Sequence, residues 1–211
     1  QKLTAALIHS SSGISFQNCR RMAKDMTKKE RETLAKKAFQ NMEFYDTLLR
    51  EFEHIDLTFD LIMSSACFAQ MKRHRMASIT SQRYNPELGI TFPPRVKEAG
   101  ETENFQAIIK ETNRLFDEIN LSHPVAAQYI LTGAHRKRIL MTVNARELYH
   151  IARLREDSHA QWDIQQLSGQ MSAMAGKVMP LAMSLIGGKD RYAEAYQKLF
   201  GRLPRVIPPK E

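Results

Sequence analysis

Apolar residues recur every three or four positions in several stretches of the chain, which is the spacing of amphipathic helices. One such run covers residues 28–53, and Thr27 with Glu30 has the pattern of a capping box at its start. A shorter helix is predicted from Ser64 or Ser65 into residues 72–75. Further helices are predicted over residues 101–119, 124–133, 145–154, 158–185 and 190–200.

Two stretches have the character of strands. Residues 54–63 alternate apolar and polar side chains, and residues 138–143 are short and rich in aliphatic and β-branched side chains. Residues 79–97 contain four of the chain's turn-forming prolines and glycines and are predicted to be a loop, whereas the proline-rich tail 203–211 is predicted to be extended. The pattern predicts an α+β fold with more helix than strand.

The size and composition are those of an ordinary globular protein. The chain has 211 residues, of which 43% are hydrophobic and 26% charged, and this suits one domain or two closely fused lobes. No apolar stretch approaches the ~20 residues that span a bilayer, and no signal peptide is evident, so we expect a cytoplasmic protein without a membrane partner. A bridge between Cys19 and Cys67 is conceivable, but two reduced thiols are the favoured interpretation.

The formal net charge is +8 and the isoelectric point is near 9.6. A basic surface attracts nucleic acids, anionic lipids and phosphorylated metabolites alike, so charge does not choose among them. The seven histidines show neither an HExxH motif nor paired Cys/His spacing, and no metal site is predicted.

One segment that carries chemistry is residues 70–84, where cationic side chains alternate with hydroxyl groups and end at Tyr84. Guanidinium groups offer forked donors that match phosphate oxygens. If residues 67–75 are helical, Gln70, Arg73 and His74 share one face. A solvated basic turn and a nucleic-acid-binding patch both remain open at this point.

A second such segment is residues 144–165, which contains the only tryptophan. Arg146, His150 and Arg153 fall on one helical stripe, and apolar residues form another. Asp157 or Ser158 is predicted to cap the following helix, whose N-terminus would favour an anion near Arg155.

The two segments together resemble the flavin-dependent thymidylate synthase family. Arg73-His74-Arg75-x-x-Ser78 followed by Ser81-x-Arg83-Tyr84 is similar to the signature of that family. A second block of the family is similar to Asn144-Ala145-Arg146-x-Leu148 with Leu154-Arg155-x-x-Ser158 through Gln165, and Phe52-Glu53-His54 also matches. The matching blocks cover about a third of the chain and run in the family's order from Phe52 to Gln165.

The resemblance implies one domain over residues 1–211, with a small mixed or antiparallel sheet flanked by long helices, in a homotetramer with shared active sites. It further implies that FAD is reduced by NADPH and that methylenetetrahydrofolate supplies the carbon that becomes the C5 methyl of dUMP. No nucleic acid or membrane partner is implied.

Site residues follow from the resemblance position by position. The residues expected to contact FAD are Arg73, His74, Arg75, Asn144, Arg146 and His150. Those expected to hold the nucleotide are Gln70, Arg73, Ser81, Gln82, Arg83 and Arg155, with Ser81 and Arg83 acting across a subunit boundary. Arg155 matches the catalytic arginine that favours ionisation of the uracil N3, because a fixed cation stabilises negative charge on the ring.

The chain departs from the family pattern near both ligands. Only residues 76–80 separate Arg75 from Ser81, where the family has about seven residues. Arg50 falls where the family often has a His-x-Ser/Thr pattern, Gln128 falls where a nucleotide-binding arginine is expected, and His150 replaces a common asparagine. A shortened loop is one way to admit a ribose 2′-hydroxyl, so UMP is an alternative substrate to dUMP.

Other classes of function remain as alternatives. One is a specialised UMP methylase in a modified-nucleoside pathway, and another is a catalytically silent paralogue that binds flavin or nucleotide without turnover. The non-enzyme alternative is a basic nucleic-acid-binding module, which predicts steep salt dependence and no bound chromophore.

Overall fold

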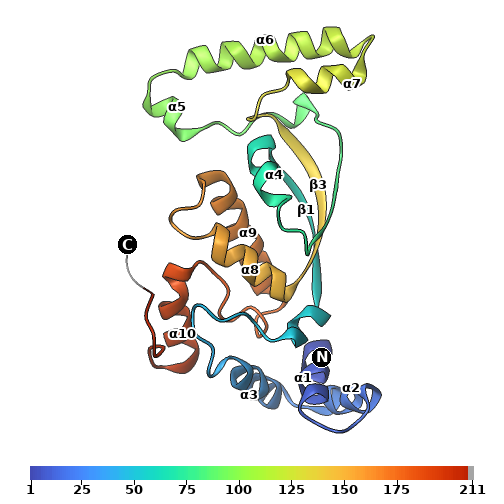
Figure 1. Ribbon diagram of the computed structural model, residues 1–211, viewed down its shortest axis with the longest axis vertical. Coiled ribbons are helices and arrows are strands. Elements are labelled where there is room, and N and C mark those ends of the chain that lie inside the picture. Colours follow the sequence, from blue (N-terminus) through green and yellow to red (C-terminus); the bar gives the residue numbers. More distant parts are fainter. Residues whose placement is uncertain (209–211) are drawn as a thin grey trace. The chain divides into compact units, whose positions relative to one another are not determined.

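The computed structural model describes residues 1–208, and the chain divides into two compact units (Figure 1). Unit 1 consists of Gln1–Thr58 and Thr142–Glu211, and unit 2 is Phe59–Met141. The boundaries between them fall inside two long strands. The expectation of a single domain over the whole chain stays a prediction.

The sheet has three strands in the order β1-β3-β2. They are β1 (Asp56–Ser64), β2 (Ser78–Ser81) and β3 (Arg136–Asn144). At one end the Ala145 N–H donates to the Ile55 carbonyl at 2.8 Å, and at the other end the Ser65 N–H donates to the His135 carbonyl at 2.9 Å. This register makes β1 and β3 antiparallel, and it confirms the predicted α+β class and both predicted strands.

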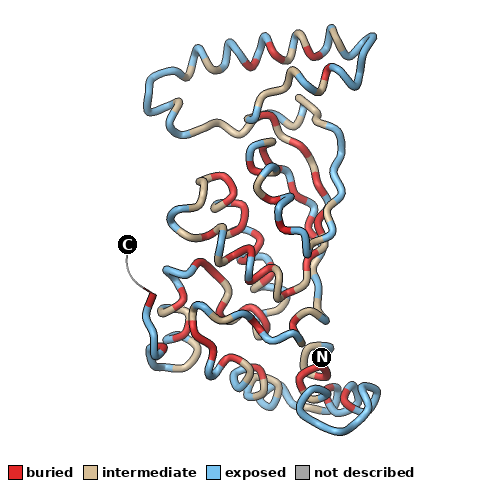
Figure 2. The backbone as a smooth tube through the Cα atoms, in the orientation of Figure 1, coloured by how far each residue is buried: buried red, intermediate tan, exposed pale blue. Residues whose placement is uncertain are grey.

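Burial alternates along both long strands, as the period of two requires (Figure 2). Their polar faces pair across the sheet: Thr58 and Thr142 share a hydroxyl hydrogen bond of 2.8 Å, and Arg138 donates to Asp60 at 2.9 Å. Full burial of an aliphatic side chain stabilises the fold by about 1.5–3 kcal/mol. The buried positions are Phe59, Leu61, Met63 and Ser64 in β1 and Lys137, Ile139, Met141 and Val143 in β3.

Unit 2 contains the longest helix, α6 (Thr102–Asn120), which confirms the helix predicted over residues 101–119. The helix predicted from Pro124 is shorter than expected, because α7 (Pro124–Ala127) passes directly into a 3-10 turn, η3 (Gln128–Ile130). Figure 1 shows α7 returning alongside α6. The remaining elements of this unit are α4 (Ser65–Met71), η2 (Pro86–Leu88) and α5 (Pro94–Glu98).

Buried His135 ties α6 to the start of β3. Its Nδ1 accepts a hydrogen bond from the Thr132 N–H at 3.0 Å, so Nε2 carries the proton and donates to Asn113 Oδ1 at 2.8 Å. Burial lowers the pKa of His135, which favours the neutral imidazole that this pair of contacts requires.

In unit 1, α8 (Ala145–Arg155) and α9 (Trp162–Val178) contact each other. At the N-terminal side, Ala5 of α1 (Lys2–Ser10) packs against Cys19 and Ala23 of α2 (Phe16–Asp25), and small side chains allow this close approach. The remaining elements are α3 (Lys28–Phe39), η1 (Arg50–His54), η4 (Lys189–Arg191) and α10 (Tyr192–Phe200).

The helix predicted over residues 28–53 is correct only in its first half. The capping box at Thr27 and Glu30 is present, but α3 ends at Phe39. Beyond it the backbone carbonyls of Asp46 and Leu48 accept hydrogen bonds from two arginines of α8, Arg153 and Arg146. These tertiary bonds replace the helical ladder, which periodicity alone does not reveal.

Three other predictions of secondary structure from the sequence are also wrong in part. Residues 79–97 are not a continuous loop, since they include most of β2 together with η2 and α5. The helix predicted over residues 158–185 is confined to α9, whose N-cap is Gln161 rather than Asp157 or Ser158. Gln161 Oε1 accepts hydrogen bonds from the N–H groups of Asp163 and Ile164, both at 3.1 Å. The helix start therefore lies farther from Arg155 along the chain than the sequence indicated.

The tail beyond Phe200 has neither helix nor strand through residue 208, and residues 209–211 of the predicted extension lie outside the described range. Gly201, in the left-handed conformation, ends α10 with φ of 70°. Arg205 and the Val206 N–H then bond to the buried carboxylate of Glu43 at 3.1 and 3.2 Å. Across residues 1–208, no helix combines the length and the hydropathy needed to cross a bilayer.

Candidate functional site

The first motif block lies in unit 2, at the C-terminal end of α4. Ser64 caps this helix by accepting a hydrogen bond from the Cys67 N–H at 3.0 Å. The helix ends at Met71, so Gln70, Arg73 and His74 do not share a helical face as predicted.

Tight turns follow the helix instead. The N–H groups of Arg73 and His74 donate to the carbonyls three residues earlier, at 3.2 and 3.1 Å. In this turn His74 is buried, whereas Arg73 and Arg75 are exposed. Two guanidinium groups are thus held in solvent on either side of a buried histidine, and such groups suit the oxygens of a phosphate.

The connection from Arg75 to Ser81 is a strand for most of its length. Only Met76 and Ala77 separate Arg75 from β2, and Ser81 is the last residue of that strand. Directly after it, the Gln82 N–H donates to the Arg138 carbonyl of β3 at 3.0 Å. Ser81, Gln82 and Arg83 are all exposed at this edge of the sheet.

Gln128 and Tyr84 join two parts of unit 2 that are distant in the sequence. The Tyr84 N–H donates to Gln128 Oε1 at 2.8 Å, and Gln128 Nε2 donates back to the Tyr84 carbonyl at 3.4 Å. The Tyr84 hydroxyl bonds to Ser65 Oγ at 2.8 Å, at the start of α4. Gln128, found where the family pattern has an arginine, therefore serves here to anchor the backbone after β2.

Lys137 is a buried cation that the sequence reasoning missed. Its ammonium lies 4.4 Å from the centre of the Phe68 ring and 4.2 Å from that of Tyr84, which are cation–π distances. The signal was present in the alternation of β3, because Lys137 occupies the same inward register as Ile139 and Met141. It keeps the aromatic end of the first motif block packed against α4.

The second motif block lies in unit 1, at the start of α8. Asn144 Oδ1 caps this helix by accepting a hydrogen bond from the Glu147 N–H at 2.9 Å. Arg146 donates to the Leu48 carbonyl at 2.8 Å, to Glu53 Oε1 at 3.0 Å and to Thr47 Oγ1 at 3.3 Å.

Glu53 also accepts from Arg50 at 3.0 and 3.2 Å. The Arg50 hydrogen bond, with a smaller contribution from Arg146, holds the pKa of Glu53 below its usual range. Arg50 lies where the chain departs from the family pattern, whereas Glu53 belongs to the matching Phe52-Glu53-His54 block. The sequence alone did not show that Arg50 pairs with the glutamate of the Phe-Glu-His motif.

The predicted stripe on α8 is only partly exposed. Within that stripe His150 is exposed and Arg146 is half-buried, while Arg153 is directed into the protein, where it donates to the Asp46 carbonyl. Burial lowers the pKa of the Arg153 guanidinium, whose Nη2 is buried without a hydrogen-bond partner among the described residues. Arg155, two residues farther along α8, is half-buried and lies on a different side of the helix from Arg153.

Glu156 is a buried carboxylate next to Arg155, and it was not singled out from the sequence. Its Oε1 accepts from Ser168 at 3.2 Å and from Ser172, two residues one helical turn apart on α9. Burial raises the pKa of Glu156, although the two serine hydrogen bonds and Arg191 oppose this. The segment after Arg155 is thus bonded to α9 through a side chain.

The main chain of the segment after Arg155 also forms hydrogen bonds with α9. Gln165 Nε2 donates to the Glu156 and Asp157 carbonyls at 3.4 and 2.9 Å. Asp157 Oδ1 in turn bonds to His159 Nδ1 at 2.9 Å, and this contact lowers the pKa of Asp157. Residues 156–161 connect Arg155 to the start of α9, and these hydrogen bonds hold the connection in place.

The predicted site residues fall into one group in each unit. Unit 2 holds Gln70, Arg73, His74, Arg75, Ser81, Gln82 and Arg83, whereas unit 1 holds Asn144, Arg146, His150 and Arg155. The expected ligand contacts of all these residues stay predictions. Neither Cys19 nor Cys67 forms a disulfide, and both are buried.

Comparison with known proteins identifies relatives over most of the chain. Residues 2–181 match the family described as thymidylate synthase complementing protein, Thy1. A protein of Thermococcus onnurineus named flavin-dependent thymidylate synthase is 37% identical over 131 residues, as is one of the same name from Pyrococcus furiosus. Each of these alignments covers 56% of this chain and 54% of the relative.

A longer alignment joins this chain to a flavin-dependent thymidylate synthase of Saccharolobus solfataricus, at 30% identity over 172 residues. It covers 78% of this chain and 64% of that protein. The chain thus spans about half the length of the first two relatives and somewhat under two thirds of the third.

Proposed function

The chain belongs to the Thy1 family of flavin-dependent thymidylate synthases, and from this premise we propose that it methylates C5 of a uridine monophosphate with the help of bound FAD. The observation that carries the proposal is the retention of both motif blocks, with two exposed guanidinium groups set in a fixed turn after α4. We propose dUMP as the substrate, methylenetetrahydrofolate as the carbon donor and NADPH as the reductant.

The residues of the first block suit a phosphate-bearing cofactor. Exposed Arg73 and Arg75 offer forked donors to the phosphates of FAD, and the turn beside buried His74 restricts where those donors can lie. Asn144, Arg146 and His150 would contact the flavin from α8. A bound flavin supplies the redox chemistry, and the protein supplies position and charge.

The nucleotide would be held by Gln70, Arg73, Ser81, Gln82 and Arg83. The exposed position of Ser81 and its two successors at a sheet edge supports this assignment, since exposed hydroxyl and guanidinium groups can reach a ligand without rearranging the core. Arg155 would lie at the uracil N3 and stabilise negative charge on the ring as C5 becomes nucleophilic. The hydrogen bonds that hold residues 156–161 in place limit how far Arg155 can move.

We propose that the active form is a homotetramer with sites completed by neighbouring subunits, located in the cytoplasm. Sedimentation velocity tests the assembly, with a tetramer expected and a monomer contradicting the shared site. Complementation between an Arg83→Ala and an Arg155→Ala protein tests the sharing itself. If the two residues come from different subunits, mixed tetramers regain a fraction of wild-type activity that neither variant has alone.

Methyl transfer to dUMP with a purified, flavin-loaded protein is the direct test of the function. A visible flavin band that bleaches on reduction, followed by formation of dTMP, is the expected result. A protein that takes up flavin and nucleotide but forms no product would instead be a silent paralogue. A colourless protein that binds only nucleic acid would overturn the proposal.

UMP is a second candidate substrate, favoured by the two-residue connection from Arg75 to β2. A shorter connection leaves room for a ribose 2′-hydroxyl, provided that a polar partner meets it. Comparison of kcat/KM for UMP and dUMP decides between the two nucleotides. A value for UMP that is negligible beside that for dUMP would remove the modified-nucleoside alternative.

A further inference from the structure

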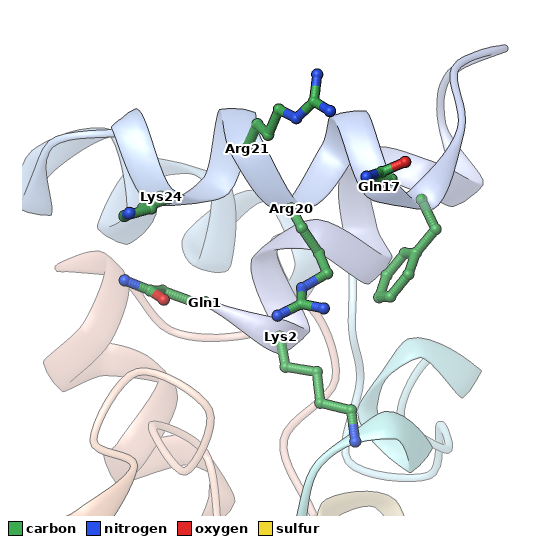
Figure 3. A pocket seen from close by; sticks show the side chains of 7 residues that line it. Gln1, Lys2, Gln17, Arg20, Arg21 and Lys24 are labelled. Carbon is green, nitrogen blue, oxygen red and sulfur yellow. The ribbon is translucent and has the colours of Figure 1, made fainter.

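A cationic cavity lies on the two N-terminal helices of unit 1, away in sequence from both motif blocks (Figure 3). Its volume is about 630 Å³. It is lined by Gln1 and Lys2 from the start of the chain and by Phe16, Gln17, Arg20, Arg21 and Lys24 from α2.

The charge of this cavity is of one sign. Four of its lining residues are cationic and none is acidic. Figure 3 shows Arg20 extending from α2 toward Lys2 of α1, so cations of the two helices lie on the same cavity. The electrostatic repulsion among these neighbouring cations is reduced when an anionic ligand binds.

Two of the four lining cations, Arg20 and Lys24, lie in line with Phe16 along α2. Phe16, Arg20 and Lys24 follow one another at four-residue intervals, which places them on one face of α2, each about 6 Å from the next along the helix axis. A compact anion would need donors that converge, whereas a row of cations suits a chain of successive phosphates. Phe16, at one end of the row, is 39% exposed, and its ring lies edge-to-face with that of His9 at 5.9 Å between centroids.

A lipid bilayer fits this surface less well. An amphipathic helix that binds a membrane uses its apolar face. In α2 the small apolar residues Cys19 and Ala23 are buried against Ala5 of α1, so that face is already occupied. The residues that α2 leaves exposed are mostly polar or cationic, and only Phe16 and Met22 among them are large apolar side chains.

We propose that the face formed by Lys2, Phe16, Arg20 and Lys24 binds single-stranded nucleic acid without sequence preference. Proteins that do so combine a cationic groove along the backbone with aromatic side chains on which bases stack. In this assignment Lys2, Arg20 and Lys24 contact successive phosphates, and Phe16 stacks on a base. The face is separate in sequence from the segment 70–84 assigned above to the nucleotide substrate.

Fluorescence anisotropy of a labelled oligothymidylate tests the proposal on the full chain. A strand of about 16 nucleotides covers the longest site expected for one such groove. Excess dUMP in the buffer keeps the strand from the proposed substrate site. The double variant Arg20→Gln/Lys24→Gln is compared with Lys36→Gln/Lys37→Gln, which removes two exposed cations of α3 and gives the same net charge.

Removal of Arg20 and Lys24 should weaken binding at least tenfold at low salt. It should also flatten the dependence of log Kd on log salt concentration by about 1.4, which corresponds to two lost phosphate contacts. Phe16→Ala should weaken binding at least about fivefold while leaving that salt dependence unchanged. The α3 control should retain nearly wild-type affinity.

Three results would overturn the proposal. Equal losses in the α2 and α3 variants would mean that only total charge matters. Complete displacement of the strand by micromolar inorganic pyrophosphate would identify a pocket for a small anion. Binding to phosphatidylserine vesicles that depends on Arg20 and Lys24, without binding to the oligonucleotide, would identify a membrane-binding face.

Discussion

Gly188 lies directly against the main chain of Glu156. A Cβ placed on Gly188 would come within 2.8 Å of the Glu156 carbonyl oxygen and 2.9 Å of its carbonyl carbon. The turn before α10 thus packs on the residue that follows Arg155, and the absence of a side chain at position 188 allows this approach.

Gly188→Ala should therefore destabilise the protein by about 1–3 kcal/mol, the usual cost of forcing atoms into a packed site. The backbone of Gly188, with φ of −62°, is open to any residue, so the cost comes from the contact alone. Urea unfolding measures the change. Gly176→Ala is the control: its Cβ would meet nothing within 4 Å inside α9, and it should add about 0.5–1 kcal/mol of stability. Equal stability of Gly188→Ala and wild type would contradict the close packing.

Glu156 should make the stability of the protein depend on pH. Its pKa is raised by burial in the folded state, so the folded protein holds the proton more tightly than the unfolded chain. The stabilisation is complete below the ordinary glutamate pKa of about 4.3 and is lost as pH rises through the raised value. Glu156→Gln keeps an oxygen to accept from Ser168 and Ser172 but cannot ionise.

Thermal midpoints of Glu156→Gln and wild type, measured across the acidic to neutral range, check this prediction. Wild type should lose stability relative to the variant as pH increases. Curves that stay parallel would show that the carboxyl does not titrate differently on folding. The Glu156→Gln protein should also retain methyl transfer at neutral pH if the role of Glu156 is only to hold the segment after Arg155.

Gln128→Ala should cost about 1–2 kcal/mol, because the half-buried Tyr84 N–H loses its acceptor. Gln128→Glu keeps the oxygen and loses only the longer bond to the Tyr84 carbonyl, so it should be closer to wild type. Chemical denaturation gives both values. A loss in Gln128→Glu as large as that in Gln128→Ala would mean that the Tyr84 N–H is not the important partner.

Arg155→Ala should leave flavin binding intact and lower the rate of methyl transfer at least ~100-fold, the scale of removing one group that stabilises developing charge. Single-turnover kinetics, with the flavin spectrum as a binding control, separates the two effects. Arg114→Ala is a matched control, since Arg114 is exposed on α6 and forms salt bridges with Glu111 and Glu118 of the same helix. Turnover near wild type in Arg155→Ala would remove that residue from the catalytic role.

The sequence predicted the elements whose stability is local. The capping box at Thr27, the alternation in β1 and the amphipathic pattern of α6 each depend on residues close together in the chain, and each is confirmed. Failures occurred where distant partners decide the backbone. The break after α3 depends on Arg146 and Arg153, which lie about a hundred residues later.

The two motif blocks were likewise recognisable in the sequence, but the hydrogen bonds that hold them in place were not. A sequence shows that Arg155 is followed by Glu156, yet it does not show that α9 places two serines on that carboxylate. The same holds for Gln128, which was noted only as a departure from an arginine. Its hydrogen bonds to Tyr84 join residues 44 positions apart, a distance that no local pattern encodes.

The two thiols provide internal probes of how each unit opens. Cys19 is fully buried in unit 1 and Cys67 is fully buried in unit 2, so neither can react with an alkylating reagent until its surroundings open. Labelling rates followed by peptide mass spectrometry would give a separate local opening free energy for each unit. Without any engineered label, the protein can therefore report whether its two units unfold together or one before the other.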